Sequence, residues 1–223
     1  MATQITPPSI SQDLMRIHKV ITRGIAVTVE KGTEYLQAGF PDPMVRKGYS
    51  DYTQSLTIIL EAHHLGEDEV AFPALREKLP SAPYERLSKN HHEIEAQLRS
   101  VRKTIPALAE TGEEASLRRL VDILRRVTAI WRPHIQAEER HFSDEALAAV
   151  MSPEEQARVT GMMAKHGQEH STPASLALPF VLFNLSGEDR NTMAAKFPTT
   201  VVEELIPNAW KEQWAPMKPF LLE

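Results

Sequence analysis

The sequence HHLGED at residues 63–68 places two histidines four residues before two carboxylates, within an otherwise apolar helical pattern. Two related phrases follow, HHEIE at residues 91–95 and HIQAE at residues 134–138. Because residues i and i+4 lie on one face of an α-helix, each phrase directs an imidazole and a carboxylate toward the same neighbour. Together with His18, the three phrases predict one buried metal site that several helices share.

The apolar stripe of the second predicted helix, about residues 44–72, decides which histidine of the first phrase points inward. The stripe contains the following residues: Leu56, Ile59, Leu60, His63, Glu67 and Val70. This phase selects His63 and Glu67 and places His64 on the flank of the helix. Pro73 is expected to end the helix.

Three more long helices are predicted from the same periodicity, over about residues 11–39, 83–112 and 117–138. Each carries one histidine in its apolar stripe: His18, His91 and His134. Glu138 shares the stripe of its helix, whereas Glu95 lies beside the stripe. Residues 1–9 are predicted to form a loop.

The chain lengths between the histidines and the turns predict that the histidines lie at one level. At 1.5 Å per residue, the turn at residues 39–43 lies about 31 Å from His18 and about 30 Å from His63. The turn at residues 111–112 is likewise equidistant, to within about 3 Å, from the histidines of the third and fourth helices. An up-down-up-down bundle therefore brings all four histidines together, near the loop between its second and third helices.

Seven side chains are the candidate metal ligands: His18, His63, Glu67, His91, Glu95, His134 and Glu138. Four imidazoles and three carboxylates are too many polar groups to bury without partners. A nitrogen and oxygen set without sulfur suits iron, manganese or zinc, and two ions bridged by carboxylates would use it well. The competing interpretation, solvated pairs on helix surfaces, is disfavoured by the apolar phase. The remaining histidines are expected outside this set: His64, His92, His141, His166 and His170.

The order and spacing of these residues resemble the hemerythrin-like, or HHE cation-binding, domains. The resemblance covers about residues 10–145, with a histidine on the first and third helices and His-x-x-x-Glu on the second and fourth. It implies a four-helix bundle around a non-heme di-iron centre, oxo- or hydroxo-bridged, in which Glu67 and Glu138 bridge the irons and histidines are terminal ligands. Oxygen-carrying hemerythrins have a histidine four residues after the position of His91, where this chain has Glu95. That departure resembles the wider HHE group, whose members take other roles.

Two classes of function follow from the ligand set and the resemblance. The first is a di-iron protein that binds or reacts with O2, H2O2 or NO, with peroxide- or oxygen-reactive chemistry as its enzymatic form. The alternative is an iron or oxygen sensor, or a metal-storage module, without catalysis. A ferritin-like oxidase is disfavoured, because those bundles use Glu-x-x-His, with the two residues three apart.

The composition of the 223 residues excludes several other classes. A net charge of −5 with interspersed signs offers no basic surface for nucleic acid. The absence of cysteine excludes disulfides and thiolate metal sites and is compatible with a reducing compartment, so we expect a cytoplasmic protein. No apolar run approaches membrane-spanning length, and the first residues lack the pattern of a signal peptide.

The chain changes character after residue 150. Ser152 and Pro153 predict the start of a fifth helix, which begins at the metal end of the bundle and could fold over its opening. From residue 174 onward, Pro, Phe and Trp concentrate, and two short helices are expected over about residues 188–196 and 200–214. We therefore predict an all-α protein: a four-helix bundle over residues 1–150 and a helical extension over residues 151–223 that packs on it.

Overall fold

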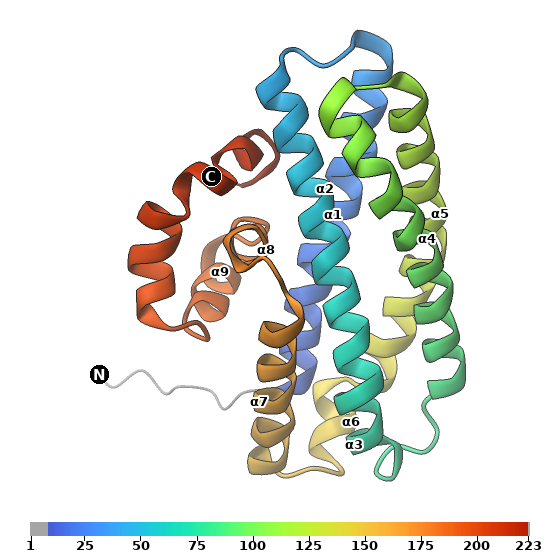
Figure 1. The fold of residues 1–223 in the computed structure, drawn as a ribbon. Helices are drawn as coiled ribbons and strands as arrows, with labels where there is room; N and C mark the ends of the chain where they lie inside the picture. The colour runs from blue at the N-terminus through green and yellow to red at the C-terminus, as the bar shows by residue number, and fades with distance from the viewer. Residues whose placement is uncertain (1–8, 223) are drawn as a thin grey trace.

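The computed structural model describes residues 9–222, so most of the predicted N-terminal loop, residues 1–8, lies outside the described part. Four long helices run side by side in alternating directions (Figure 1). They are α1 (Ile10–Ala38), α2 (Pro43–Gly66), α4 (Tyr84–Thr111) and α5 (Glu114–His141). Successive helices contact one another, and α1 also contacts α5, which closes the bundle. The predicted all-α, up-down-up-down bundle is confirmed, and no strand occurs in residues 9–222.

Capping residues fix the ends of these helices where the sequence predicts turns. Ser9 accepts a hydrogen bond from the backbone N–H of Gln12, and Asp42 accepts one from Val45 at 2.8 Å. Gly112 ends α4 in the left-handed region at φ 69°, a conformation that glycine adopts without steric cost. These turns set the lengths that align the histidines.

The end of the second helix differs from its prediction. After α2, the chain continues through a π-helical turn, η1 (Glu67–Ala71), into α3 (Phe72–Arg76), so that Pro73 does not end the helical run. Pro73 lies in the first turn of α3, where its missing N–H costs little. The wide turn therefore starts at a predicted metal ligand, as π-bulges at functional sites often do.

The remaining elements are short, apart from α7. They are α6 (Asp144–Ala148), α7 (Pro153–His170), α8 (Ala174–Phe183), α9 (Gly187–Ala194), η2 (Val201–Ala209), α10 (Lys211–Trp214) and η3 (Ala215–Phe220). The predicted fifth helix corresponds to α7, which begins with a capping box between Ser152 and Glu155. The structure adds α6, α8 and η3, whose residues show no helical period in the sequence.

The extension lies along one side of the bundle (Figure 1). Its α7, α8 and η3 all contact α2, and α7 also contacts α1 and η1 beside the loop between α3 and α4. Phe180, Met217 and Phe220 are buried in the same hydrophobic cluster as the core of the bundle. At Gly48 of α2, a Cβ atom would collide with the carbonyl oxygen of Pro216, so the extension approaches α2 as closely as only glycine permits. None of the helices in the described part is both long and apolar enough to cross a membrane.

Candidate metal centre

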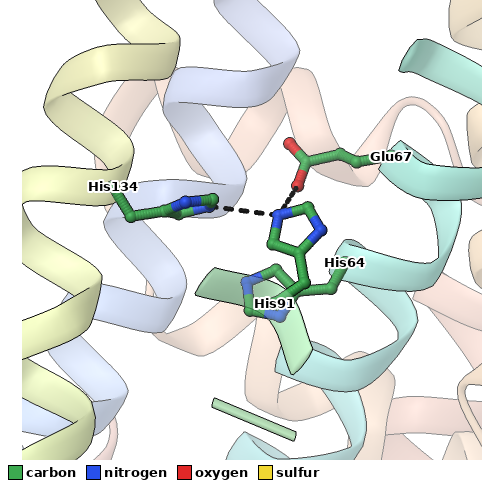
Figure 2. A group of neighbouring side chains, drawn as sticks. All are labelled: His64, Glu67, His91 and His134. Carbon is green, nitrogen blue, oxygen red and sulfur yellow. Dashed lines mark hydrogen bonds and ion pairs between the residues drawn. The ribbon is translucent and has the colours of Figure 1, made fainter. Parts of the chain in front are cut away.

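The four long helices and η1 bring seven buried side chains together in two groups that share one carboxylate. The first, called the His64 group, consists of His64, Glu67, His91 and His134 (Figure 2). The second, called the His18 group, consists of His18, His63, Glu67 and Glu138. Within each group, one ligand atom from every residue lies within 4.8 Å of the others. Two metal-sized clusters thus adjoin at Glu67.

Both carboxylates lie between imidazoles that belong to different groups. Glu67 Oε2 lies 3.3 Å from His91 Nε2 and 3.4 Å from His63 Nε2. Glu138 Oε1 lies 3.2 Å from His134 Nε2, and its other oxygen lies 3.2 Å from His18 Nε2. Each carboxylate therefore faces both groups, an arrangement that a bridging ligand requires.

Two carboxylates outside the groups, Asp68 and Glu139, contact the Nδ1 atoms of His91 and His18. His91 Nδ1 lies 2.8 Å from Asp68 Oδ2, and Ser88 donates a hydrogen bond to the other oxygen of Asp68. His18 Nδ1 lies 2.9 Å from Glu139 Oε1. Such contacts orient each ring so that its Nε2 atom faces the cluster, where it can donate its lone pair to a metal ion once the Nε2 proton is lost.

Aromatic rings close the walls of the cluster. The Trp131 ring lies 5.3–6.0 Å from the ring centres of His18, His63 and His64, and its Nε1 donates to Thr22 at 2.9 Å. On the other side, Phe72 stacks on His91 at 5.5 Å. These apolar walls keep the dielectric constant low around the ligands, which strengthens every charge interaction there.

The local helix geometry explains why two adjacent histidines both reach the site. His63 and His64 are the last histidines before the π turn, and the backbone N–H of Glu67 is shared between their two carbonyl oxygens. His63 faces His18 at a ring distance of 5.2 Å, whereas His64 stacks on His91 at 4.1 Å. Neighbouring residues of α2 thus serve the two different groups.

Burial and neighbouring charges divide the imidazoles into two classes. Burial opposes the charged form of His18, but Glu138 and Glu139 raise its pKa to about 9. Burial also opposes the charged form of His91, but Asp68 and the cluster carboxylates raise its pKa to about 11. At His63 and His64, burial and nearby imidazoles lower the pKa well below its usual value.

The two central carboxylates also have opposite pKa shifts. Burial and the negative charge of Glu138 raise the pKa of Glu67. Burial also opposes ionisation of Glu138, but the contacts with His134, His18 and His91 hold its pKa well below the usual range. Two carboxylates at this spacing repel each other when both are ionised, and bound cations would remove that repulsion.

The hydrogen bonds of the cluster test whether a metal fits. All four oxygens of Glu67 and Glu138 lack a hydrogen-bond partner within the described residues, although they are fully buried. The Nε2 atoms of His18, His63 and His64 lack one as well. Buried polar atoms are normally satisfied, and those left over here are lone-pair donors that aim at common points. This donor set fits metal ions.

Comparison with known families agrees with this geometry. The family model of the hemerythrin HHE cation binding domain matches residues 9–146. The chain belongs to this family. No curated protein and no solved structure matches the chain. The matched residues span the bundle and include both groups of the cluster, so the HHE domain supplies every residue of the candidate centre.

Two of the sequence-based expectations about this HHE domain need correction. The side chain of Glu95 is 48% exposed and pairs with Arg99 at 2.5 Å, so it is not brought to the cluster. Its position, one residue from the stripe of α4, rotates it about 100° away from the interior. His64, expected on the flank of α2, is instead buried in the His64 group. The other expected ligands all lie in the two groups.

The remaining histidines lie outside both groups, as expected. His92 is exposed and contacts the carbonyl oxygen of Ser88, and His141 belongs to neither group. His166 stacks on His170 at 4.3 Å and contacts Glu69 of η1 at 3.0 Å. The α7 histidines therefore lie beside the centre and contribute no ligand to it.

Sequence reasoning missed Asp68, Glu139 and Trp131. Asp68 follows His64 by four residues, a spacing that suggests a pair on one helix, but its partner in the fold is His91 of α4. Glu139 is adjacent to a ligand and follows the helix surface pattern. Trp131 precedes His134 by three residues on the apolar stripe, which indicated a core position but not a wall of the site.

Proposed function

We propose that the cluster binds two metal ions, one in each group, and that Glu67 and Glu138 bridge them. The observation that carries this proposal is the pair of buried carboxylates between two sets of imidazoles, whose four oxygens lack hydrogen bonds within the described residues. A buried carboxylate without a partner is costly, and a cation between the two groups offsets that cost. Membership of the HHE cation binding family supports the same conclusion.

Iron is the occupant that we propose for these two positions. Imidazole and carboxylate donors without sulfur suit iron, manganese and zinc, and the family resemblance adds iron to the argument. Zinc and manganese are the competing occupants, because they accept the same donors. Metal content of the protein from iron-grown cells distinguishes the three.

The function that such a centre supports best is binding of, or reaction with, a small molecule such as O2, H2O2 or NO. A pair of irons would supply redox chemistry and an open position for the small molecule. This chain's own residues hold the donors rigid through Asp68 and Glu139. Trp131 and Phe72 pack against the imidazoles and would limit the access of water to them.

Anaerobic reconstitution tests the proposal. The metal-free protein is titrated with ferrous iron and then exposed separately to O2, H2O2 and NO, while visible spectra are recorded. We expect two irons per chain and new absorption bands with at least one of the three molecules. Uptake of one ion or none, or unchanged spectra with all three, would contradict the proposal.

A second function, sensing, is favoured by one contact. Helix α7 packs on η1, which carries Glu67, and His166 contacts Glu69 there at 3.0 Å. A change at the centre could therefore alter how α7 packs, and a partner could read that change. Limited proteolysis with and without metal tests this: identical cleavage of α7 and the segments after it would argue against sensing.

A further inference from the structure

An apolar cavity of about 200 Å³ separates the extension from the metal end of the bundle. The bundle contributes one wall, which includes Leu14 and Ile17 of α1 and Phe72 of α3. The extension contributes the other, which includes Met163 of α7 and Val181 of α8. We call this cavity the chamber.

The chamber reaches the candidate metal centre. His63 and Glu67, both members of the His18 group, line it. Both oxygens of Glu67 and the Nε2 atom of His63 lack hydrogen-bond partners in the described structure. A molecule in the chamber would therefore lie beside the ligands of one metal position.

The outer wall of the chamber is formed by residues that lie beyond the matched family domain. The family match ends at residue 146, whereas α7, α8 and α9 begin at residue 153 and beyond. These helices cover the bundle surface next to His63 but leave space there. The extension thus adds an outer wall to a cavity at the centre, and the matched domain alone would lack that wall.

On the side of the chamber that the extension forms, the hydroxyl of Thr160 is a buried polar atom without a hydrogen-bond partner in the described structure. Thr160 lies in the middle of α7, and the residue is only 9% exposed. Apart from Glu67 of the metal centre, the charged residues of the wall are Asp13 and Lys196, which form an ion pair with each other. Away from the metal centre, the wall therefore offers mainly apolar contact and one buried, unpartnered hydroxyl, without a free charge for an ionic ligand.

We propose that the chamber binds a small, neutral, mostly apolar organic molecule that carries one hydrogen-bonding group, next to the metal centre. An apolar cavity of 150 Å³ can hold benzene, so this chamber has room for about eight to ten non-hydrogen atoms. A diatomic molecule needs neither that volume nor a hydroxyl partner. The position beside the ions rests on the proposed two-metal function, whereas the binding itself rests on the chamber alone.

Benzyl alcohol and toluene are suitable probes, because they share an apolar ring and differ by one hydroxyl. Calorimetric titration of the zinc-loaded protein, which is redox-inert, should show one site for benzyl alcohol per chain. Absence of saturable binding of either probe would overturn the proposal.

Two glycines of α7 give a matched pair of variants. Gly167 lines the chamber and Gly161 does not, and a Cβ atom added at either position meets nothing within 4 Å. Gly167→Leu should fill part of the chamber and weaken benzyl alcohol binding by about 10-fold or more, since it removes the space that the ring occupies. Gly161→Leu should leave the affinity unchanged. Equal affinities for the two variants would overturn the proposal.

Thr160→Val removes the hydroxyl from the chamber wall with little change in the shape of the side chain, so it tests the proposed hydrogen bond. Benzyl alcohol should bind about 5- to 10-fold more weakly to this variant, because the hydroxyl partner is lost. Toluene should bind equally well or better. An equal effect on both probes would overturn the role of Thr160.

Loading the protein with manganese tests the position of the chamber. Paramagnetic manganese should shorten the proton relaxation times of bound benzyl alcohol relative to zinc, and equal relaxation times would overturn the placement beside the ions. If the protein takes up no metal, the proposed function fails. The titration and the glycine variants then decide on the chamber in the metal-free protein.

Discussion

The metal end of the bundle and the region around Tyr49 and Tyr52 both bury polar groups, but they satisfy them differently. Around the tyrosines, the hydroxyl of Tyr49 donates to the carbonyl oxygen of Thr28, and that of Tyr52 donates to Asn184 at 2.7 Å. Arg23 donates to Asn184, to Tyr52 and to the carbonyl oxygen of Phe220. At the metal end, the carboxylate oxygens have no such partners.

This difference teaches how to separate structural from functional polar groups in one core. The tyrosine region uses complete hydrogen-bond networks to join α1 and α2 to the extension, which contributes to stability. The metal end carries leftover lone pairs at a cost in stability, and a bound ion recovers that cost. Substitutions at the two regions should therefore affect different measurements.

The largest effect is expected at Glu67, the residue that both groups share. Glu67→Gln keeps the shape but removes a charged bridging ligand, so the affinity for both ions should fall by more than about 100-fold. The metal-free variant should be at least as resistant to urea as the parent, because the change removes repulsion with Glu138. Metal content and urea unfolding measure the two outcomes. Glu95→Gln, on the exposed face of α4, is the control and should retain full metal content.

Acidification should weaken metal binding next most strongly. His18 and His91 have pKa values raised to about 9 and about 11, so at pH 7 both carry a proton that an ion must displace. Binding should release about two protons at pH 7, and the affinity should rise up to about 100-fold per pH unit below pH 9. Titration in weak buffer with a pH indicator measures the release. Uptake of metal without proton release would contradict the protonated state.

Substitution of the outer carboxylates, Asp68 and Glu139, should reduce the metal affinity less, and by different amounts in the His64 group and the His18 group. Asp68→Asn should lower the metal affinity by about 10- to 100-fold, because it weakens the contact that orients His91. Glu139→Gln should lower the metal affinity less, because Glu139 is more exposed and water can replace its contact with His18. Competition with a chelator gives both affinities. A larger loss for Glu139→Gln would reverse this order.

The smallest effect on metal binding is expected from the tyrosine region, where a substitution should change the stability of the fold alone. Asn184→Ala removes the acceptor of Tyr52 and Arg23, and it should lower the free energy of unfolding by about 1–3 kcal/mol. Asn208→Ala, on an exposed position of η2, should change it by less than about 0.5 kcal/mol. Loss of metal in Asn184→Ala would show that the two regions are not independent.

The sequence predicted the bundle and most of the cluster because both depend on period and length. The helix lengths between turns placed His18, His63, His91 and His134 at one level, and all four lie in the two groups. His64 was misplaced because one apolar stripe defines only one inward direction, whereas α2 contributes adjacent residues to two metal positions. The π turn after Gly66 has no sequence signal of its own.

Features that arise from packing between distant segments could not be predicted. The apolar residues of α8 show no helical period, because much of that helix is buried on several sides. The contact of Asp68 with His91 depends on how α2 lies against α4. The chamber exists only when α7 and α8 lie against α1 and α2, so no local pattern reports it.

The loose packing of α7 should set the rate at which a bound metal ion leaves the centre. Only Gln156, Val159 and Thr160 of this helix are buried, so little apolar surface holds it in place. Elements with so little burial open locally far more often than the whole molecule unfolds. Because α7 covers η1, the lifetime of a bound ion should follow these opening events rather than the affinity of the ligands. Hydrogen exchange at α7 and metal release should then share one rate constant.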